Sequence, residues 1–317
     1  MIHYTLKQLR YFVAAAKVDS VTRAAENMNV SQPSISAAIA HLEDAFGLQL
    51  FVRHHAQGMS MTPDGRRFMV EAIRSLKNAE ELGLFAAGLG GALKGNLDVA
   101  CFSSVSSIVM PCLIRAFGME SSGISITSHE GYHETLVKGL RSGEYEQALT
   151  FELDICEDLE FLPLATLPTY VIMSEKNPLS SREIISLEEL EEQPMVHLDL
   201  PLSRDYFNSL FSGLNLKPSV SQRVESVDMT RSMVANDFGY SLSNIVHLQS
   251  SSLNYEKRGG LRALDGQRYC AIPIVEDLRP LRLGLTHLKN GRLTRKAEAF
   301  AEFCKEYFAG AYLKYNQ

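Results

Sequence analysis

The sequence predicts an all-α winged helix-turn-helix segment, then one long linker helix, then a C-terminal α/β domain. Two short helical patterns flank a polar turn between residues 20 and 46, and an apolar stripe at helical spacing runs from residue 68 to about residue 89. Strand and helix patterns then alternate from residue 96 onward, as an α/β domain requires. The expected boundaries are 1–62, 63–93 and 94–317.

Composition places the chain among ordinary globular proteins. It has 317 residues, of which 45% are hydrophobic and 21% charged, enough for two or three domains. Its apolar stretches fall far short of the ~20 residues that a membrane span needs, and no signal peptide pattern opens it. The five cysteines (101, 112, 156, 270 and 304) show no Cys-x-x-Cys pair. We therefore expect free thiols, a cytoplasmic location and no membrane contact.

The formal net charge of −6 argues at first against a nucleic-acid partner, but the charge is unevenly distributed. Residues 1–67 hold seven Lys/Arg and five Asp/Glu, a balance of +2, whereas the remainder holds 24 and 32, a balance of −8. Such a weak basic surplus predicts modest non-specific DNA affinity for one N-terminal segment. Joining several segments would raise that affinity.

The first helix is expected from apolar residues at helical spacing, which are Leu6, Leu9, Phe12, Val13 and Ala16. Ser20 is a good N-cap for the next helix, in which Ala24 and Ala25 allow a close helix crossing. Asn27 and Asn29 then mark a tight turn.

The helix after the turn carries the clearest sequence signals. Ser31 is expected to cap it, with Pro33 in its first turn. Its apolar stripe consists of Ile35, Ala38, Ile39, Leu42 and Phe46. The opposite face carries small or neutral polar side chains, which are Gln32, Ser34, Ser36, Ala37, Ala40 and His41. A face this lean suits close contact with major-groove base edges; an ordinary helical hairpin in a core is the alternative.

A wing and a linker follow. Gly47 should end the helix, residues 48–52 and 59–61 should pair as a hairpin, and Arg53 would approach phosphates or a minor groove. Thr62-Pro63-Asp64-Gly65 is a strong helix start. The helix that it opens keeps heptad-like spacing at Phe68, Ala72, Leu76, Ala79, Leu82 and Ala86. Its length favours pairing with a second copy, with burial in the same chain as the alternative, and the glycines at 88, 90, 91 and 95 predict a hinge.

Across some sixty residues, in order and without gaps, this segment resembles the N-terminal signature of the LysR-type bacterial transcription regulators. The matching features are Leu9, Phe12, Ala24-Ala25, Ser31-Gln32-Pro33, Ser36, Leu42-Glu43, Gly47, Leu50-Phe51, Arg53, Thr62 and Gly65. The resemblance implies promoter DNA, a small-molecule effector, further copies of the chain in a dimer or tetramer, and RNA polymerase as partners. It implies no enzyme activity, metal or cofactor, and leaves activator or repressor open.

The DNA contacts expected here fall into two groups. Base readout is assigned to Gln32, Pro33, Ser34 and Ser36. Phosphate or minor-groove contact is assigned to Thr22, Arg23, Arg53, Thr62 and Arg66. Many relatives carry basic residues where this chain has Ala37 and Ala40, so a strong guanine contact should be missing and DNA shape should matter more.

For residues 94–317 the resemblance, looser here, implies two α/β lobes like those of a periplasmic solute-binding protein. Lobe I would comprise about 94–167 and 272–317, and lobe II about 168–271. A small effector between the lobes would contact Ser103, Ser104, Gly131, the His197 to Ser203 loop and Ser226. Serines at helix starts favour a small carboxylate, although each serine can equally serve as a helix cap.

Two other functions remain open. The chain could be a small-molecule binding protein or enzyme whose N-terminal helices serve dimerisation alone, or a redox sensor using Cys101 or another thiol. His129-Glu130-Gly131-Tyr132-His133 fits the zinc-hydrolase spacing H-E-x-x-H. It straddles the end of an expected strand with glycine at its centre, so we do not assign zinc chemistry to it.

Overall fold

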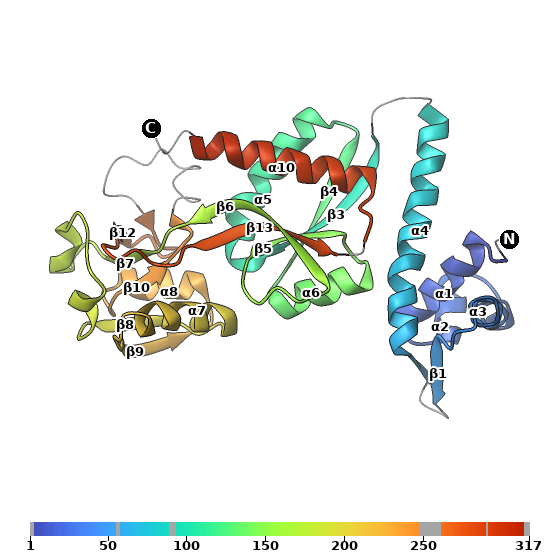
Figure 1. The fold of residues 1–317 in the computed structure, drawn as a ribbon, viewed down its shortest axis with the longest axis horizontal. Coiled ribbons are helices and arrows are strands. Elements are labelled where there is room, and N and C mark those ends of the chain that lie inside the picture. The colour runs from blue at the N-terminus through green and yellow to red at the C-terminus, as the bar shows by residue number, and fades with distance from the viewer. Residues whose placement is uncertain (1–2, 55–57, 89–92, 247–260, 290, 314–317) are drawn as a thin grey trace. The chain divides into compact units, whose positions relative to one another are not determined.

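The computed structural model describes the chain except residues 1–2, 55–57, 89–92, 247–260, 290 and 314–317 (Figure 1). It divides into two compact units. One comprises Met1–Cys101, Ile114–Ala148 and His287–Glu302, and the other comprises Phe102–Leu113, Leu149–Thr286 and Phe303–Gln317. None of the described helices combines the length and the hydropathy that a membrane span requires.

The N-terminal residues form a winged helix-turn-helix. The helices are α1 (Leu6–Val18), α2 (Val21–Asn27) and α3 (Gln32–Phe46), and the wing is a hairpin of β1 (Phe51–His54) and β2 (Gly58–Met61). The expected hairpin tip includes residues 55–57, which lie outside the described residues. The first strand begins at Phe51 rather than at Leu48 because the Glu43 carboxylate accepts hydrogen bonds from the amides of Leu50 and Phe51, at 2.8 and 3.2 Å.

Local chemistry sets the ends of these helices. The Ser20 hydroxyl accepts from the Arg23 amide at 3.3 Å, and Asn29 and Gly47 adopt left-handed conformations, with φ of 52° and 62°. Ser31 lies at the N-cap of α3, but the expectation that its side chain caps the helix is wrong. Its hydroxyl is 2.7 Å from the Ser34 hydroxyl and makes no bond to the backbone of the first turn.

The core of the winged helix-turn-helix forms where α1, α3 and α4 (Pro63–Gly88) meet. Phe12 is fully buried, and its ring lies 5.4 Å from the ring of Phe51 and 5.2 Å from that of Phe68. Phe68 and Leu76 of α4 pack against the same core, whereas Leu82 is 67% exposed. The first part of the linker stripe therefore packs within its own chain, whereas Leu82 faces solvent.

Elements of the α/β region form a five-stranded sheet with the order β4-β3-β5-β13-β6. Its strands are β3 (Gly95–Phe102), β4 (Ile124–Gly131), β5 (Gln147–Phe151), β6 (Leu159–Leu167) and β13 (Leu281–Leu288). The associated helices are α5 (Ser103–Glu120), α6 (His133–Ser142) and α10 (Arg295–Leu313). Phe117 and Phe300 join α5 to α10, with ring centroids 5.3 Å apart. Part of the expected glycine hinge, residues 89–92, lies outside the described residues.

A second group of strands follows in the chain. A four-stranded sheet has the order β10-β7-β12-β11, with β7 (Tyr170–Ser174), β10 (Ser241–Ser243), β11 (Leu261–Arg262) and β12 (Arg268–Pro273). A parallel pair comprises β8 (Pro194–Leu198) and β9 (Ser219–Val224), and the helices are α7 (Pro201–Ser212) and α8 (Val227–Ala235). The two groups of strands match the expected two-lobed α/β fold.

α7 begins at Pro201, because proline suits the first helical position. Ser186 and Glu189 form a reciprocal cap on a 3₁₀ turn, Glu188–Leu190.

Substitution of Gly65 tests the close packing between the wing and α4. A Cβ there would lie 2.1 Å from the Leu50 carbonyl oxygen, whereas a Cβ at Gly83 of the same helix would meet nothing within 4 Å. We predict that Gly65→Ala lowers the free energy of unfolding by about 1–3 kcal/mol. Gly83→Ala, the matched control, should raise it by about 0.5–1 kcal/mol.

Urea unfolding of the full chain, followed by circular dichroism, measures both changes. Equal stability of Gly65→Ala and the wild type would contradict the close approach to Leu50.

Candidate functional site

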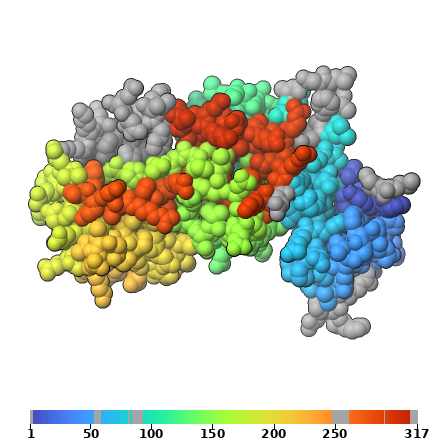
Figure 2. All heavy atoms as spheres, viewed as in Figure 1, coloured from blue at the N-terminus to red at the C-terminus, as the bar shows by residue number. Residues whose placement is uncertain are grey.

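The outer face of α3 is held toward solvent by its inner face. Ile35 and Leu42 are completely buried, and Ala38 and Ile39 are nearly so. This fixes the rotation of the helix about its axis. Ser36 is half-buried, and the exposed residues of the outer face are Gln32, Pro33, Ser34, Ala37, Ala40 and His41. Figure 2 shows blue atoms of the N-terminal helices at the molecular surface.

This face carries little charge. The sequence has no lysine or arginine between Arg23 and Arg53. Gln32 and Ser34 occupy the first turn, at the helix end whose partial positive charge favours an anion. The Ser34 hydroxyl shares a hydrogen bond with Ser31 and keeps acceptor capacity for another group. The surface can thus approach a polar, anionic partner closely and hydrogen-bond to it.

The residues expected to contact phosphates or the minor groove lie on α2 and β1 and at the start of α4. Thr22 and Arg23 are exposed in the first turn of α2. Arg66 is exposed on α4, and its guanidinium donates to the Met61 carbonyl at 2.8 Å, which holds it beside the wing. Arg53 stands on β1 opposite Met59.

Thr62 has a structural role in the same area. Its hydroxyl donates to the Gln49 carbonyl at 2.6 Å and accepts from the Gly65 amide at 2.8 Å. These bonds tie the start of α4 to the wing and use much of the bonding capacity of the hydroxyl.

A cavity that is open to solvent lies among the first turns of α5, α7 and α8. Its polar side chains are Ser104, Ser203, Thr230, Arg231, Ser243 and Asn244. Its apolar lining comprises Phe151, Ile172, Leu198, Phe207, Val227, Leu242, Ile245 and Leu281. The arrangement suits a ligand with an apolar body and an anionic group.

The sequence analysis missed four polar lining residues, which are Thr230, Arg231, Ser243 and Asn244. The Arg231 guanidinium donates to Asp228 at 3.0 Å, and its side chain is 12% exposed. The Asn244 amide donates to the Leu167 carbonyl, at 3.1 Å, and to the Thr169 hydroxyl, at 2.9 Å. Arg231 could have been identified from the sequence, because it is a cation in the helix that Ser226 caps. No local pattern marks Asn244.

The six expected effector residues have different environments. Ser104 and Ser203 line the cavity, and Ser103 begins α5 next to Ser104. Ser226 caps α8 through the Met229 amide at 3.3 Å. Gly131 ends β4, where a Cβ would lie 2.9 Å from the Thr135 side chain.

His197 is buried in β8, and neither ring nitrogen has a hydrogen-bond partner among the described residues. Burial, and then the nearby Arg223, lowers the pKa of its imidazole, which favours the neutral form.

The histidine motif and the cysteines have other surroundings. The His129 ring is 3.0 Å from the Asp98 carboxylate, and His133 begins α6. No group of three potential metal ligands converges in the described part of the chain. Cys101 and Cys304 are completely buried, and burial raises the pKa of the Cys270 thiol to about 11. A protonated thiol is a poor nucleophile toward oxidants.

Comparisons with known proteins agree with this geometry. A family described as "LysR substrate binding domain" matches residues 90–309, and one described as "Bacterial regulatory helix-turn-helix protein, lysR family" matches residues 6–66. The uncharacterized HTH-type transcriptional regulator YvbU of Bacillus subtilis is 26% identical over 305 residues, covering 96% of this chain and 99% of that protein.

Solved structures give the same answer. The crystal structure of HinK, a LysR family transcriptional regulator from Pseudomonas aeruginosa, has 32% sequence identity and a TM-score of 0.62, covering 96% of this chain and 99% of that chain. A full-length OxyR variant from Pseudomonas aeruginosa shares the fold at 23% identity, with a TM-score of 0.70 and 96% of each chain covered. The chain therefore belongs to the LysR family of DNA-binding bacterial transcriptional regulators, which are not enzymes, and carries the effector-binding domain of that family.

Proposed function

We propose that α3 reads base edges in the major groove through Gln32, Pro33, Ser34 and Ser36. The observation that carries this proposal is the exposed, cation-free face of small side chains, held outward by the buried stripe of α3. Small side chains let the helix backbone lie close to the base edges, where glutamine and serine form hydrogen bonds. The alternative in which these helices serve dimerisation alone does not account for that exposed face.

The remaining contacts position the protein on the duplex. Thr22, Arg23, Arg53 and Arg66 contact phosphates or the minor groove, and Thr62 acts mainly by fixing the start of α4. Because one head carries a small positive surplus, two or four heads joined through α4 act together on an imperfect palindrome. The exposed Leu82 supports pairing of α4 with a second copy. We place the assembly in the cytoplasm, where it contacts RNA polymerase at the promoter.

The second part of the proposal concerns the effector. A small carboxylate with an apolar body binds in the cavity beside Ser104 and Ser203. Arg231 supplies the positive charge, and the first turns of α5 and α8 supply backbone amides. Occupancy shifts the assembly between two arrangements that hold DNA differently.

DNA reading is tested with the DNA upstream of the protein's own gene. We predict a salt-sensitive gel shift, and Ser36→Arg should weaken binding to that site by about 10-fold or more, because a bulky cation faces groups that the serine accommodates. Binding to a scrambled fragment of equal length should stay the same or strengthen, because a cation attracts any phosphate backbone.

A parallel change in affinity for both fragments would remove Ser36 from the readout. Failure of the wild type to shift any promoter fragment at low ionic strength would contradict the DNA assignment of α3.

The effector site is tested by thermal-shift screening of small carboxylates. For any carboxylate that raises the melting temperature, Arg231→Met should weaken binding by about 10- to 100-fold, because a hydrogen bond to a charged group is lost. Arg262→Met, which removes an arginine that does not line the cavity, should bind as the wild type does. Unchanged carboxylate binding by Arg231→Met would exclude Arg231 from the site.

A further inference from the structure

The linker helix α4 packs against the regulatory domain of its own chain along one side. Ile73 lies against Gly143, which ends α6 in a left-handed conformation with φ of 68°. A Cβ on Gly143 would be 3.3 Å from the nearest atom of the Ile73 side chain, so this side chain packs directly on the Gly143 backbone. This apolar contact places the middle of α4 beside the end of α6.

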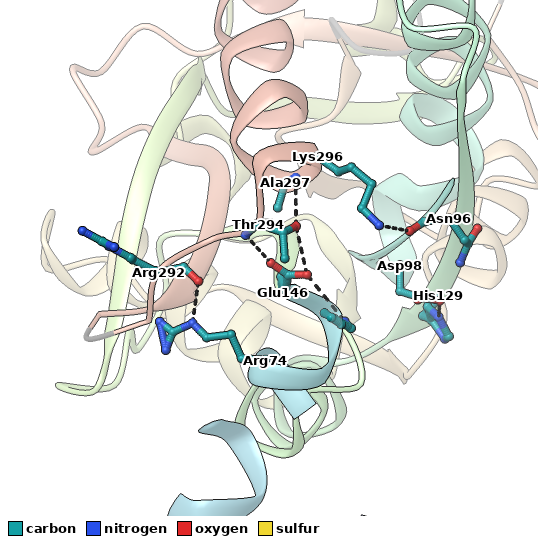
Figure 3. A network of polar contacts seen from close by, with 10 residues as sticks. Arg74, Asn96, Asp98, His129, Glu146, Arg292, Thr294, Lys296 and Ala297 are labelled. Carbon is teal, nitrogen blue, oxygen red and sulfur yellow. Dashed lines mark hydrogen bonds and ion pairs between the residues drawn. The ribbon is translucent and has the colours of Figure 1, made fainter. Parts of the chain in front are cut away.

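Arg74 of α4 reaches the segment that leads into α10 (Figure 3). The Arg74 Nε donates to the Arg292 carbonyl at 2.8 Å, and the Arg74 guanidinium is also held by Glu71 of α4 at 2.9 Å. Lys77 lies one turn further, with its Nζ 3.5 Å from the Glu146 carboxylate. The side chains of Lys77 and Glu146 are 26% and 15% exposed, so solvent screens this ion pair less than a surface pair.

Glu146 has a second set of partners in the regulatory domain. Its carboxylate accepts from the Thr294 amide at 2.8 Å and from the Thr294 hydroxyl at 3.3 Å. Thr294 precedes α10, and its hydroxyl accepts from the Ala297 amide at 3.4 Å. A carboxylate at this position is favoured by the partial positive charge of the helix N-terminus.

Glu146 is therefore held firmly on the regulatory side, whereas its bond to α4 is a single ion pair. Lys296, also at the start of α10, donates to the Asn96 carbonyl at 3.1 Å and anchors the same region to β3. A small pocket open to solvent lies beside these contacts, lined by both α4 and the regulatory domain.

From these contacts we propose that Glu146 is a positioning residue, which locks the linker helix to the regulatory domain through Lys77. The lock fixes the position of α4 in the effector-free protein. The strength of the lock sets how far the DNA-binding heads respond to the regulatory domain. The inference rests on the DNA binding proposed above for its second readout, while its first readout needs no DNA.

Lys77→Met and Glu146→Gln open the lock in different ways. Lys77→Met removes the cation and leaves the cap on α10 intact. Glu146→Gln removes the charge but keeps an oxygen that can accept from the Thr294 amide. Lys138→Met is the matched control, because Lys138 is an exposed lysine of α6, which packs against α4, and lies outside the lock.

The first readout is hydrogen exchange in the full-length protein. Both lock variants should exchange amides of residues 70–80 about 3- to 10-fold faster than the wild type, as expected for loss of a partly buried ion pair. The double variant should add little to either single variant, because both remove the same interaction. Lys138→Met should match the wild type.

The second readout is the footprint and bend angle on the upstream DNA without effector. Both lock variants should change them, with half-site affinity within about twofold of the wild type. Wild-type exchange in both lock variants would overturn the proposal. So would faster exchange with an unchanged footprint and bend, because the lock would then not position the heads. If the wild type binds no promoter DNA, the DNA assignment fails, and the exchange experiment still decides whether the lock exists.

Discussion

The burial of one stripe of α3 is the constraint on which the DNA-binding end of this protein depends. Ile35 and Leu42 have no exposed surface, so the helix cannot rotate without opening the core that it shares with α1. The same packing aligns Glu43, whose carboxylate fixes the start of the wing through the amides of Leu50 and Phe51. The wing in turn supports Gly65 and the start of α4. The orientation of the outer face of α3, the wing and the linker thus follow from one packed interface.

Much of this architecture could be predicted from the sequence because the signals are local. The apolar spacing of α3, the Ser20 cap and the glycine after Phe46 each act within a few residues. One expected bond is absent. Ser31 occupies the N-cap of α3, but its hydroxyl bonds to the Ser34 hydroxyl and not to the backbone of the first turn.

The effector cavity and the lock lie beyond such signals, because they depend on residues that are distant in the chain. Ser104 and Ser203 could be singled out as serines near helix starts, and both line the cavity. The tertiary fold brings Asn244 to the cavity, where its amide donates to the Leu167 carbonyl and the Thr169 hydroxyl. Glu146 likewise meets Thr294 across 148 positions. Neither pairing leaves a periodic pattern in the sequence. In the proposed mechanism the cavity binds the effector, and the lock restrains the linker helix.

Methylation interference on the upstream DNA tests the central claim most directly, because N7 methylation of guanine blocks the major groove at single base pairs. We predict that methylation at defined positions in two half-sites abolishes binding of the wild type. Ser34→Ala should lose sensitivity at one position within each half-site, which would identify the base that this serine contacts. Wild-type binding that tolerates methylation at every guanine of the protected region, in both half-sites, would contradict major-groove reading by α3.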